Sequence, residues 1–480
     1  MKKIHDVLII GAGVTGTMIA RELSKFLLDV VILDKNNDAG DATSSANSAI
    51  IHSGYDPEPG SLKAKFNVLG NAKYPELVKQ LDVPFIQCGS LTIAIEDEQM
   101  PVLEELAKRS KVNGVEVKLL NKEEVLKMEP NINPEVKGAL FAPTAGIIDP
   151  FNLVVHAMEN AIDNGVSFLR NHEVLGIEKQ DDVYLVKTNK EELYAKVVIN
   201  AAGVFSDKIA AMVEPIDWAI TPRKGEYFLL DHYAEGLVNH TIFPLPSKKG
   251  KGVLVSQTSS GNYIVGPNSE LANPDDVSTD GETLGNIRKA ASLMVPSIPF
   301  NQTIRVFAGE RATCTRHDFI IEYAKSDKHF INVAGIESPG LASSPAIAEY
   351  VVNELVKPLI TFKSNLKFNP CIKPYHRMHY LSEEEQLQTI KENPDFGEII
   401  CNCEHISLGE IKEALSRSCP PVSIKGVKRR TRSGYGKCQG GFCQPKVLML
   451  LAKHYNISPT EVLLAEEGSY IIDHIIKEAK

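Results

Sequence analysis

The first 34 residues contain the pattern that most restricts the fold of this chain. Residues Asp6–Ile10 form a largely apolar run, residues 11–16 read GAGVTG, and residues 17–26 repeat apolar side chains at helical spacing. A second apolar run, Val30–Leu33, follows and is closed by Asp34. A strand, a glycine-rich turn, a helix and another strand in this order predict a βαβ unit of a parallel sheet.

The glycines of this turn predict a dinucleotide site. Gly11 permits the tight turn, Gly13 lets the backbone approach a pyrophosphate, and Gly16 lets the helix pack closely on the strand. The helix N-terminus then faces the phosphates, and Asp34, about 20 residues on, suits a ribose hydroxyl. The pattern does not separate FAD from NAD, and a glycine-rich turn kept for packing is the alternative interpretation.

Length and charge limit the classes of protein that fit this motif. At 480 residues the chain is long enough for two or three domains with separate cores. Its 52 Lys and Arg against 61 Asp and Glu give a formal charge of −9, which argues against nucleic acid as the main partner. We find no cleavable signal and no run of roughly 18 to 20 apolar residues, so we expect a cytoplasmic protein without a transmembrane segment.

Four of the eight cysteines lie close together near the C-terminus, as Cys401-x-Cys403 and Cys438-x4-Cys443. In the cytoplasm, cysteines are more often thiols or metal ligands than disulfides. Tetrahedral thiolate sites suit zinc and iron–sulfur clusters alike, but the one-residue gap is unusual for structural zinc, which is the rival interpretation. Four glycines would let backbone N–H groups reach the sulfurs: Gly434, Gly436, Gly440 and Gly441.

Four segments resemble the signatures of one flavoprotein superfamily. They read DATSSANSAIIHSG at 41–54, VINAAGVFSDKIA at 198–210, PRKGEYFLL at 222–230 and INVAGIESPGLASSPAIAEYV at 331–351. They are similar to FAD-binding and substrate-domain segments of the glycerol-3-phosphate dehydrogenase and D-amino-acid-oxidase-like superfamily, over roughly residues 1–355. The turn and this resemblance together imply FAD contacts by Gly11, Gly13, Val14, Thr15, Gly16, Asp34, Lys35, Thr43, Ser44, Ser45, Asn47, Ser48, Ala202, Gly203, Gly335, Glu337, Ser338, Gly340, Leu341 and Ala342.

Between these segments, short alternating apolar runs broken by Gly, Pro and Asn indicate antiparallel strands. We therefore predict an α/β chain, α+β overall, in which a Rossmann-type FAD-binding domain receives an antiparallel-sheet substrate domain as insertions, followed by a small iron–sulfur domain. The expected boundaries are 1–80, 145–215 and 310–355 for the FAD domain, 80–145 and 215–310 for the substrate domain, 355–396 for a connecting arm, and 397–480 for the cluster domain with C-terminal helices.

A flavin that oxidises a C–H bond beside a hydroxyl or amine needs a proton acceptor and cations for an anionic substrate. His52 follows the loop expected at the isoalloxazine ring, and the resemblance implies that it is the base or orients the ring. Arg311 matches the substrate-contacting arginine of the family's AG-x-R turn and suits a carboxylate or a phosphate. Lys224 is a further candidate, although charges beside strands are often solvated or paired. Lys63 and Lys65 could add positive charge near the end of the loop.

Two branches of the superfamily compete for the substrate. The PRKGEY segment and the appended cluster domain resemble bacterial glycerol-3-phosphate dehydrogenases, whereas IIHSG followed by PGSLKAK resembles L-2-hydroxyglutarate dehydrogenases. Asp56 lies where the membrane-associated glycerol-3-phosphate dehydrogenases have a phosphate-binding arginine. We expect sn-glycerol 3-phosphate first, L-2-hydroxyglutarate second, and an amino acid or opine third.

The C-terminal segment closely resembles the bacterioferritin-associated-ferredoxin-like 2Fe-2S domain. The resemblance implies that its four cysteines hold a 2Fe-2S cluster that relays single electrons to a redox protein or subunit, in an oligomer or a hetero-complex. A regulatory or docking module is the alternative, and an oxidase would have no evident use for the cluster. The basic run KGVKRRTR at 425–432 is expected to be a solvated face, or to guide an acidic electron-transfer partner or balance the cluster charge.

Overall fold

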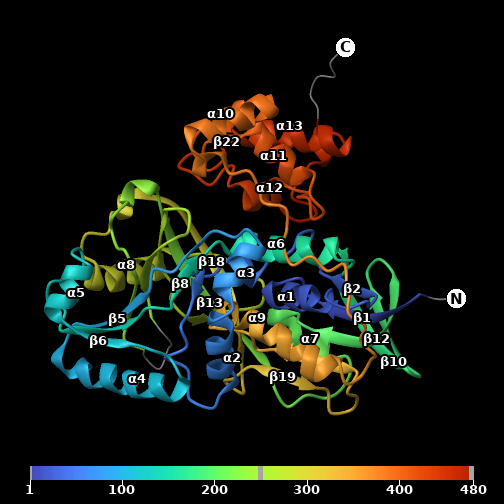
Figure 1. Cartoon of the computed structure of the whole chain (residues 1–480), viewed down its shortest axis with the longest axis horizontal. Helices are drawn as coiled ribbons and strands as arrows, with labels where there is room; N and C mark the ends of the chain where they lie inside the picture. Colours follow the sequence, from blue (N-terminus) through green and yellow to red (C-terminus); the bar gives the residue numbers. More distant parts are fainter. Residues whose placement is uncertain (1–2, 247–251, 475–480) are drawn as a thin grey trace.

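The computed structural model describes residues 3–246 and 252–474 and confirms the predicted fold class. Figure 1 shows a Rossmann-type domain and a domain built on a second large sheet lying side by side, with a small C-terminal domain above them. The second sheet takes its strands from residues 90–142 and 220–314, so the chain leaves the Rossmann-type domain and returns to it.

A parallel sheet forms the centre of the Rossmann-type domain. β1 (Ile4–Ile10) lies between β2 (Val30–Leu33) and β12 (Glu192–Asn200), with β9 (Ser167–Leu169) beyond β2 and β20 (Phe330–Ala334) beside β12. β2, β20, most of β1 and the second half of β12 are buried on both faces, which explains their largely apolar sequences, whereas β9 at the edge is only partly buried. Their carboxyl ends meet at one edge, where the glycine-rich turn begins.

Different elements cover the two faces of this sheet. On one face, α1 (Val14–Leu23) packs against α6 (Pro150–Asp163) and α9 (Gly340–Tyr350). The other face is covered by the hairpin of β10 (Val174–Gln180) and β11 (Val183–Thr188). The domain also contains α2 (Leu62–Asn71), α3 (Tyr74–Gln80), α7 (Ser206–Ala211), β3 (Ile50–Ile51), β4 (Phe85–Ile86), β8 (Gly146–Ile148) and β19 (Ile320–Tyr323).

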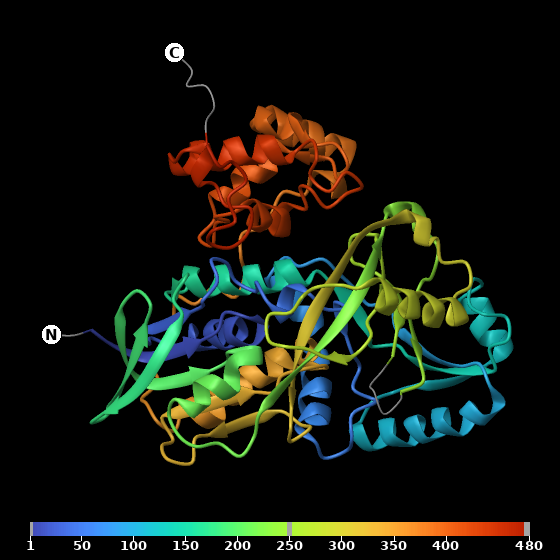
Figure 2. The ribbon, with the colours of Figure 1, turned by 180° about the vertical axis from the view of Figure 1, so that it is seen from behind.

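Two long strands organise the second domain. β13 (Ile220–Leu230) and β18 (Thr303–Cys314) pair antiparallel along their length, and Figure 2 shows them side by side across the molecule. The expected boundary at residue 310 falls inside β18, so this strand belongs to the second sheet and also reaches the Rossmann-type domain. The remaining strands pair antiparallel except β14 with β5, which are parallel. They are β5 (Ser90–Ala94), β6 (Lys118–Asn121), β7 (Gly138–Ala142), β14 (Thr241–Pro244), β15 (Leu254–Gln257), β16 (Tyr263–Gly266) and β17 (Glu270–Leu271), with helices α4 (Met100–Asn113), α5 (Lys122–Met128) and α8 (Gly281–Met294) beside them.

The C-terminal domain has its own small core, which contains Cys401 and Cys443. The arm before it contains a helix that the sequence pattern did not predict, α10 (Glu383–Glu392). A capping box of Ser382 and Glu385 begins this helix, but none of its side chains is buried, so it lacks the apolar stripe that would have revealed it. The other elements are β21 (Ile399–Cys401), β22 (Ile406–Ser407), α11 (Leu408–Leu415), α12 (Ile424–Thr431) and α13 (Gln444–Tyr455). Across residues 3–246 and 252–474, no helix combines the length and apolar character needed to cross a membrane.

Candidate active site and cluster site

An open cavity runs along the carboxyl edge of the parallel sheet and ends against the second domain. It encloses about 1030 Å³ of empty space, part of which is continuous with solvent. Its lining residues fall within 13–15, 43–52, 201–203, 309–312 and 333–341, and Tyr227 joins them from β13. Open α/β sheets bind their ligands at this edge.

Close backbone contacts fix the glycine-rich turn. Gly11 has a φ of 102°, and a Cβ atom there would lie 2.5 Å from the carbonyl oxygen of Ala201. A Cβ atom at Gly16 would lie 2.0 Å from the carbonyl oxygen of Gly11. The N–H group of Val14 donates to Ser44 Oγ at 2.9 Å. The N-terminus of the ten-residue helix α1 therefore faces the cavity beside residues 41–48, the hydroxyl-rich loop. This arrangement suits a pyrophosphate.

Asp34 supports the turn from the end of β2. Its carboxylate accepts the N–H groups of Ala12 at 2.7 Å and Asn36 at 2.9 Å. Burial raises the pKa of Asp34 in spite of these two bonds. The carboxyl group lies outside the cavity lining, so its expected contact with a ribose stays a prediction.

The hydroxyl-rich loop is held in shape by Asn47 and by the second sheet. Asn47 Nδ2 donates to the carbonyl oxygen of Ser44 at 2.9 Å, and Asn47 Oδ1 accepts the N–H group of Ala49 at 2.7 Å. A Cβ atom at Gly309 would lie 2.0 Å from the carbonyl oxygen of Ala46. β18 therefore packs directly on this loop, which a larger residue at position 309 would prevent.

His52 and Arg311 line the same cavity from different domains. Asn67 Nδ2 donates to the backbone oxygen of His52 at 2.6 Å, and the His52 ring centroid lies 5.7 Å from that of Phe243. Arg311 Nη2 donates to the backbone oxygen of Asn268 at 3.1 Å. The cavity thus brings together a titratable ring and a guanidinium, the two groups expected for oxidation of an anionic substrate.

Gly225 leaves the space that the Arg311 guanidinium occupies. A Cβ atom at Gly225 would lie 2.6 Å from Arg311 Nη2. In the part of the chain that the structure describes, no carboxylate forms an ion pair with this guanidinium, whose hydrogen-bond partner is a backbone oxygen. Its positive charge is therefore not neutralised before an anion enters the cavity.

Lys63, by contrast, is neutralised by a residue of the cavity. Lys63 Nζ donates to Glu337 Oε1 at 2.7 Å, and the Thr313 hydroxyl donates to Glu337 Oε2 at 2.6 Å. Both charged side chains are 17% exposed. Lys65 lies over the rings of Phe66 and Tyr350. The positive charge considered near the loop end is thus already partnered.

The expected FAD-contacting residues divide into two groups. Those that line the cavity are Gly13, Val14, Thr15, Thr43, Ser44, Asn47, Ser48, Gly203, Glu337, Ser338, Gly340 and Leu341. Those that lie outside its lining are Gly11, Gly16, Asp34, Lys35, Ser45, Ala202, Gly335 and Ala342.

Lys224 is not brought to the cavity. Its Nζ lies 3.2 Å from Asp276 Oδ2 and 3.3 Å from Ser278 Oγ. Neighbouring residues of a strand face opposite sides of a sheet, and it is Gly225 that packs on Arg311. A catalytic role for Lys224 therefore stays a prediction without a contact in the cavity.

Two polar lining side chains, Tyr227 and Glu310, were missed by the sequence analysis. Tyr227 stacks on Phe307 with ring centroids 4.8 Å apart, and its Oη lies 3.3 Å from Ser48 Oγ. Glu310 is 7% exposed and accepts the N–H group of Asp275 at 3.0 Å. Burial raises the pKa of Glu310. Strand alternation could have revealed Tyr227, two residues after Gly225, whereas Glu310 had no signal beyond its neighbour Arg311.

The four cysteines of the C-terminal domain approach one another in two hydrogen-bonding pairs, Cys401 with Cys443 and Cys403 with Cys438. The Cys443 thiol and the N–H group of Gly434 lower the pKa of Cys401 to about 5. Two pairs of cysteine sulfurs suit the two irons of a 2Fe-2S cluster. Over residues 3–246 and 252–474, no three His, Cys, Asp or Glu side chains are grouped as ligands of one ion.

The loop of residues 433–443, the cluster loop, contains glycines that bring its backbone close to the sulfurs. Burial alone would raise the pKa of Cys438, but the N–H groups of Phe442 and Gly440 and the Cys403 thiol lower it on balance. A Cβ atom at Gly436 would lie 2.4 Å from the Cβ atom of Cys403. Of the four glycines predicted to bring backbone donors to the cluster sulfurs, Gly434 acts on Cys401, and Gly440 and Gly441 act on Cys438.

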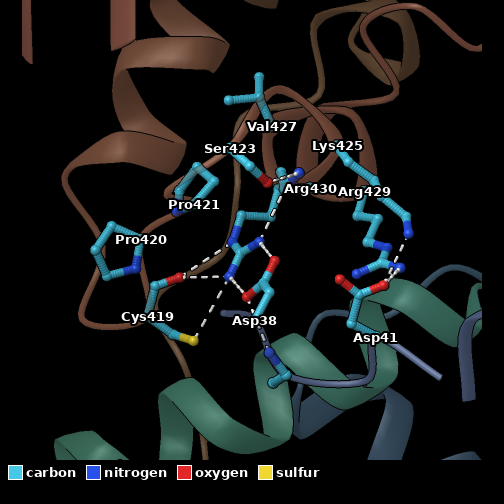
Figure 3. A network of polar contacts seen from close by, with 12 residues as sticks. Asp38, Asp41, Cys419, Pro420, Pro421, Ser423, Lys425, Val427, Arg429 and Arg430 are labelled. Carbon is cyan, nitrogen blue, oxygen red and sulfur yellow. Dashed lines mark hydrogen bonds and ion pairs between the residues drawn. The ribbon is translucent and has the colours of Figure 1, made fainter. Parts of the chain in front are cut away.

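The basic run at 425–432 is not the solvated face that we expected. It forms α12, which packs against α6 of the Rossmann-type domain (Figure 3). Arg430 binds Asp38 through both ends of its guanidinium, with Nη1–Oδ2 at 2.7 Å and Nη2–Oδ1 at 2.8 Å. Both side chains are buried, and Arg430 Nη2 also donates to the backbone oxygen of Cys419 at 2.9 Å. The charge is used inside the molecule because Asp38 complements it.

A second set of contacts joins α12 to the hydroxyl-rich loop. Arg429 pairs with Asp41, and Lys425 Nζ lies 2.9 Å from Asp41 Oδ1 (Figure 3). Arg429 also donates to Ser45 Oγ at 3.1 Å. Ser45 follows Ser44, which bonds the first turn of α1. The C-terminal domain therefore contacts the loop that lines the cavity.

The C-terminal domain also contacts the second domain beside the cluster cysteines. Arg432 donates to Glu404 Oε2 at 2.9 Å and to Asn262 Oδ1 at 2.8 Å. His232 Nε2 lies 3.4 Å from Glu404 Oε1, and Glu404 follows Cys403 in the chain. The C-terminal domain is thus fixed to both larger domains.

Comparison with known protein families agrees with the sequence signatures. The sequence model described as FAD dependent oxidoreductase matches residues 6–354. The one described as BFD-like [2Fe-2S] binding domain matches residues 399–453. These matches confirm the predicted resemblance and both predicted cofactors.

Several known proteins are similar to this chain. A glycerol 3-phosphate dehydrogenase of Caloramator mitchellensis is 46% identical over 471 residues, which cover 98% of each chain. A glycerol 3-phosphate oxidase of Mycoplasma genitalium is 37% identical over 376 residues, covering 76% of this chain and 97% of that protein. The dithionite-reduced, FAD-bound structure of the L-alpha-glycerophosphate oxidase of Mycoplasma pneumoniae is similar with a TM-score of 0.74 and 33% identity, covering 78% of this chain and all of that one.

Proposed function

The chain belongs to the FAD-dependent oxidoreductase family, and from this premise we propose that it oxidises sn-glycerol 3-phosphate to dihydroxyacetone phosphate and delivers the electrons through a 2Fe-2S cluster to a partner protein. One observation supports the proposal most: His52 and Arg311 line the same cavity as Gly13 and Ser44. The substrate is suggested by the similar protein of Caloramator mitchellensis, which is named a glycerol 3-phosphate dehydrogenase.

The residues of the cavity fit FAD, and the paired cysteines fit the cluster. The N-terminus of α1 and the hydroxyl of Ser44 would hold the pyrophosphate, and Gly203 and Gly340 leave room for an extended ligand. When bound, FAD supplies a hydride acceptor and the cluster supplies one-electron transfer.

Within this proposal, Arg311 and His52 have separate tasks. The Arg311 guanidinium holds the substrate phosphate through paired N–H donors and so orients C2 in the cavity. His52 accepts the proton of the C2 hydroxyl while the C2 hydrogen leaves as hydride, which together convert the alcohol to a ketone. The phosphate ester is unchanged.

Delivery to a partner protein rather than to oxygen is supported by the length of the match to an oxidase. The Mycoplasma genitalium oxidase is matched over 97% of its length but covers 76% of this chain. About a quarter of this chain thus has no counterpart there, and the 2Fe-2S match falls at residues 399–453. We infer that this added domain gives the electrons a route other than oxygen.

L-2-hydroxyglutarate is the second candidate substrate. Asp56, where the resemblance expects a phosphate-binding arginine, favours it. A carboxylate also suits the Arg311 guanidinium. The two candidates carry nearly the same negative charge near neutral pH but differ in the kind and the placement of their anionic groups, so one experiment separates them.

We would mix the anaerobic, oxidised enzyme with each substrate in a stopped-flow spectrometer and follow flavin bleaching. The proposal expects rapid bleaching with sn-glycerol 3-phosphate and slow bleaching with L-2-hydroxyglutarate, with the non-phosphorylated glycerol as a control. Bleaching by L-2-hydroxyglutarate alone would transfer the assignment to that acid. Bleaching by neither, but by an amino acid or opine, would contradict oxidation of a hydroxy anion.

The role of His52 is tested by the pH dependence of flavin reduction. In the wild-type enzyme the rate should rise with pH as the imidazole loses its proton and becomes able to accept another. His52→Gln should lower the rate about 100-fold or more and remove that rise. A variant that keeps the wild-type pH profile would show that another group accepts the proton.

A further inference from the structure

The C-terminal domain has a charge opposite to that of the whole chain. Residues 414–460 contain nine Lys and Arg and no Asp or Glu, although acidic residues exceed basic ones by 61 to 52 overall. The basic residues are Arg417, Lys425, Lys428, Arg429, Arg430, Arg432, Lys437, Lys446 and Lys453. Whether this charge can attract a partner depends on which of them face solvent.

Most of these cations are used inside the molecule. Arg430 pairs with Asp38, Arg429 and Lys425 pair with Asp41, Arg432 pairs with Glu404, and Arg417 pairs with Glu159 and Glu413. Burial lowers the pKa of Lys428 to about 8. Three lysines remain on the surface: Lys446, Lys453 and Lys437, whose Nζ lies 5.8 Å from the ring centroid of Tyr233 in the second domain.

The exposed lysines lie in the same stretch of the chain as exposed apolar side chains and the cluster cysteines. Phe442, between Cys438 and Cys443, is 81% exposed, and Met449 on α13 is 56% exposed. Lys446, Met449 and Lys453 follow one another at helical spacing along the exposed side of α13. In Figure 1, α12 lies on the side of the domain nearest α6, whereas α13 lies farther from the two larger domains.

The four cluster cysteines also differ in their exposure to solvent. Cys403 is exposed and Cys438 is half-buried, whereas Cys401 and Cys443 are buried. The pair of Cys403 and Cys438 is therefore the one nearer to solvent. Phe442 belongs to the same loop, because it lies between Cys438 and Cys443 in the chain.

We propose that the exposed residues Lys437, Phe442, Lys446, Met449 and Lys453, the docking face, receive an acidic one-electron carrier protein. This inference rests on the proposed delivery of electrons through the cluster. Aromatic and Met side chains are enriched in the centres of interfaces, and a lysine rim attracts carboxylates without a buried ion pair. A small face of this kind suits the brief contacts of electron-transfer proteins. One electron passes to an oxidised metal centre of the carrier, the cluster is oxidised by one electron, and no proton or bond is transferred.

The first test compares an acidic with a basic acceptor. Full-length enzyme would be reduced photochemically with deazaflavin, which bypasses the substrate, and mixed with ferric cytochrome b5, an acidic haem protein, or cytochrome c, a basic one. Cytochrome b5 should be reduced faster at low salt, and its rate should fall as salt rises, because salt screens exposed charges. A faster reaction with cytochrome c at low salt, or no effect of salt, would overturn the proposal.

Charge reversal locates the face. Lys446→Glu with Lys453→Glu should lower the rate of cytochrome b5 reduction about tenfold or more at low salt. Lys111→Glu with Lys190→Glu changes the net charge equally on α4 and on the β11–β12 turn, and should have less than about a twofold effect. Equal losses in both double variants would mean that net charge, and not this face, governs the reaction.

A binding measurement provides a readout independent of electron transfer. Carbodiimide should cross-link cytochrome b5 carboxylates to Lys437, Lys446 or Lys453, identified by mass spectrometry, and the cross-link should be lost at high salt. Cross-links confined to other lysines would overturn the proposal. So would loss of cytochrome b5 binding together with tight, Lys446-dependent binding to phosphatidylglycerol vesicles, which would assign the face to a membrane surface. Because reduction does not use the substrate, a failed substrate assignment would leave these results unaffected.

Discussion

Arg311 reaches the cavity because Gly225 leaves room for its guanidinium. A hydrogen bond to a charged group contributes about 1.5–3 kcal/mol, so Arg311→Ala should raise the KM for the anionic substrate about 10- to 100-fold. The FAD content, measured from the visible spectrum of the purified enzyme, should stay normal. An unchanged KM would remove Arg311 from the substrate site.

Arg316 offers a matched control for that substitution. It lies five residues further along the chain, but its guanidinium pairs with Asp217 and Glu322 and is 34% exposed. Arg316→Ala should therefore change KM by less than about twofold, since exposed ion pairs contribute little. A comparable rise in KM for both variants would point to general loss of positive charge.

At this scale the sequence predicted residues whose role follows from a local motif. Gly13, Ser44 and His52 line the cavity because they belong to the turn and to the loop that resembles a superfamily signature, and their contacts with FAD or substrate stay predictions. Lys224 and Glu310 could not be placed, because their surroundings come from distant segments: Asp276 pairs with Lys224, and the N–H group of Asp275 donates to Glu310, whose burial raises its pKa. A single sequence does not encode such pairings in any local pattern.

Among the elements, α12 shows how a basic helix can hold two domains together through a buried ion pair, here the clamp formed by Arg430 and Asp38. The Arg430 and Asp38 side chains are 0% and 1% exposed, and breaking such a pair leaves an unpaired buried charge, which costs about 3–5 kcal/mol. Arg430→Gln should therefore release the C-terminal domain at a lower urea concentration, followed by loss of cluster absorbance. Lys425→Gln, which removes a 41% exposed partner of Asp41, should shift this midpoint little. If both variants unfold like the wild type, the clamp does not hold the domain.

The ion pair of Asp38 and Arg430 also predicts how the attachment of the C-terminal domain to the Rossmann-type domain depends on pH. Burial alone would raise the pKa of Asp38, but Arg430 outweighs this effect and lowers the pKa below its ordinary 3.8. A carboxyl group with a lowered pKa stabilises the folded state above its unfolded pKa and loses that contribution only as the pH falls through the folded value. The difference in urea midpoint between wild type and Asp38→Asn should thus be the same at about pH 8 and about pH 5.5. A difference that shrinks over this interval would mean that another group titrates.

The elements that the sequence predicted well are those with a strong period and a buried face. β1, β2 and α1 follow the apolar pattern, and their ends lie within a few residues of those expected. α10 was missed because only two of its residues, Leu387 and Ile390, are apolar and none of its side chains is buried, and α12 was misjudged because charged side chains usually face water. What makes α12 an interface is Asp38 and Asp41, nearly 400 residues earlier in the chain.

In the whole molecule, the C-terminal domain contacts both domains that line the cavity, the Rossmann-type domain and the second domain. Arg429 binds the hydroxyl-rich loop of the Rossmann-type domain, and Arg432 binds Asn262 of the second domain. The cluster cysteines are thus fixed relative to the cavity rather than attached by the arm alone. A fixed position favours a relay, whereas a module used only for regulation or docking does not require one.

The choice between relay and docking module is decided by removing a ligand without removing the domain. Cys403 is exposed, so Cys403→Ser should disturb the cluster while leaving the small core around Cys401 and Cys443 intact. If the cluster is the relay, substrate should bleach the flavin at the wild-type rate, while reduction of cytochrome b5 falls at least about tenfold. Loss of the reduced-cluster signal in electron paramagnetic resonance would confirm that the ligand was removed. Cys371→Ser, at an exposed cysteine of the arm, is the control and should change neither rate. If cytochrome b5 is still reduced at the wild-type rate without the cluster signal, the electrons leave from the flavin site and the C-terminal domain serves docking instead.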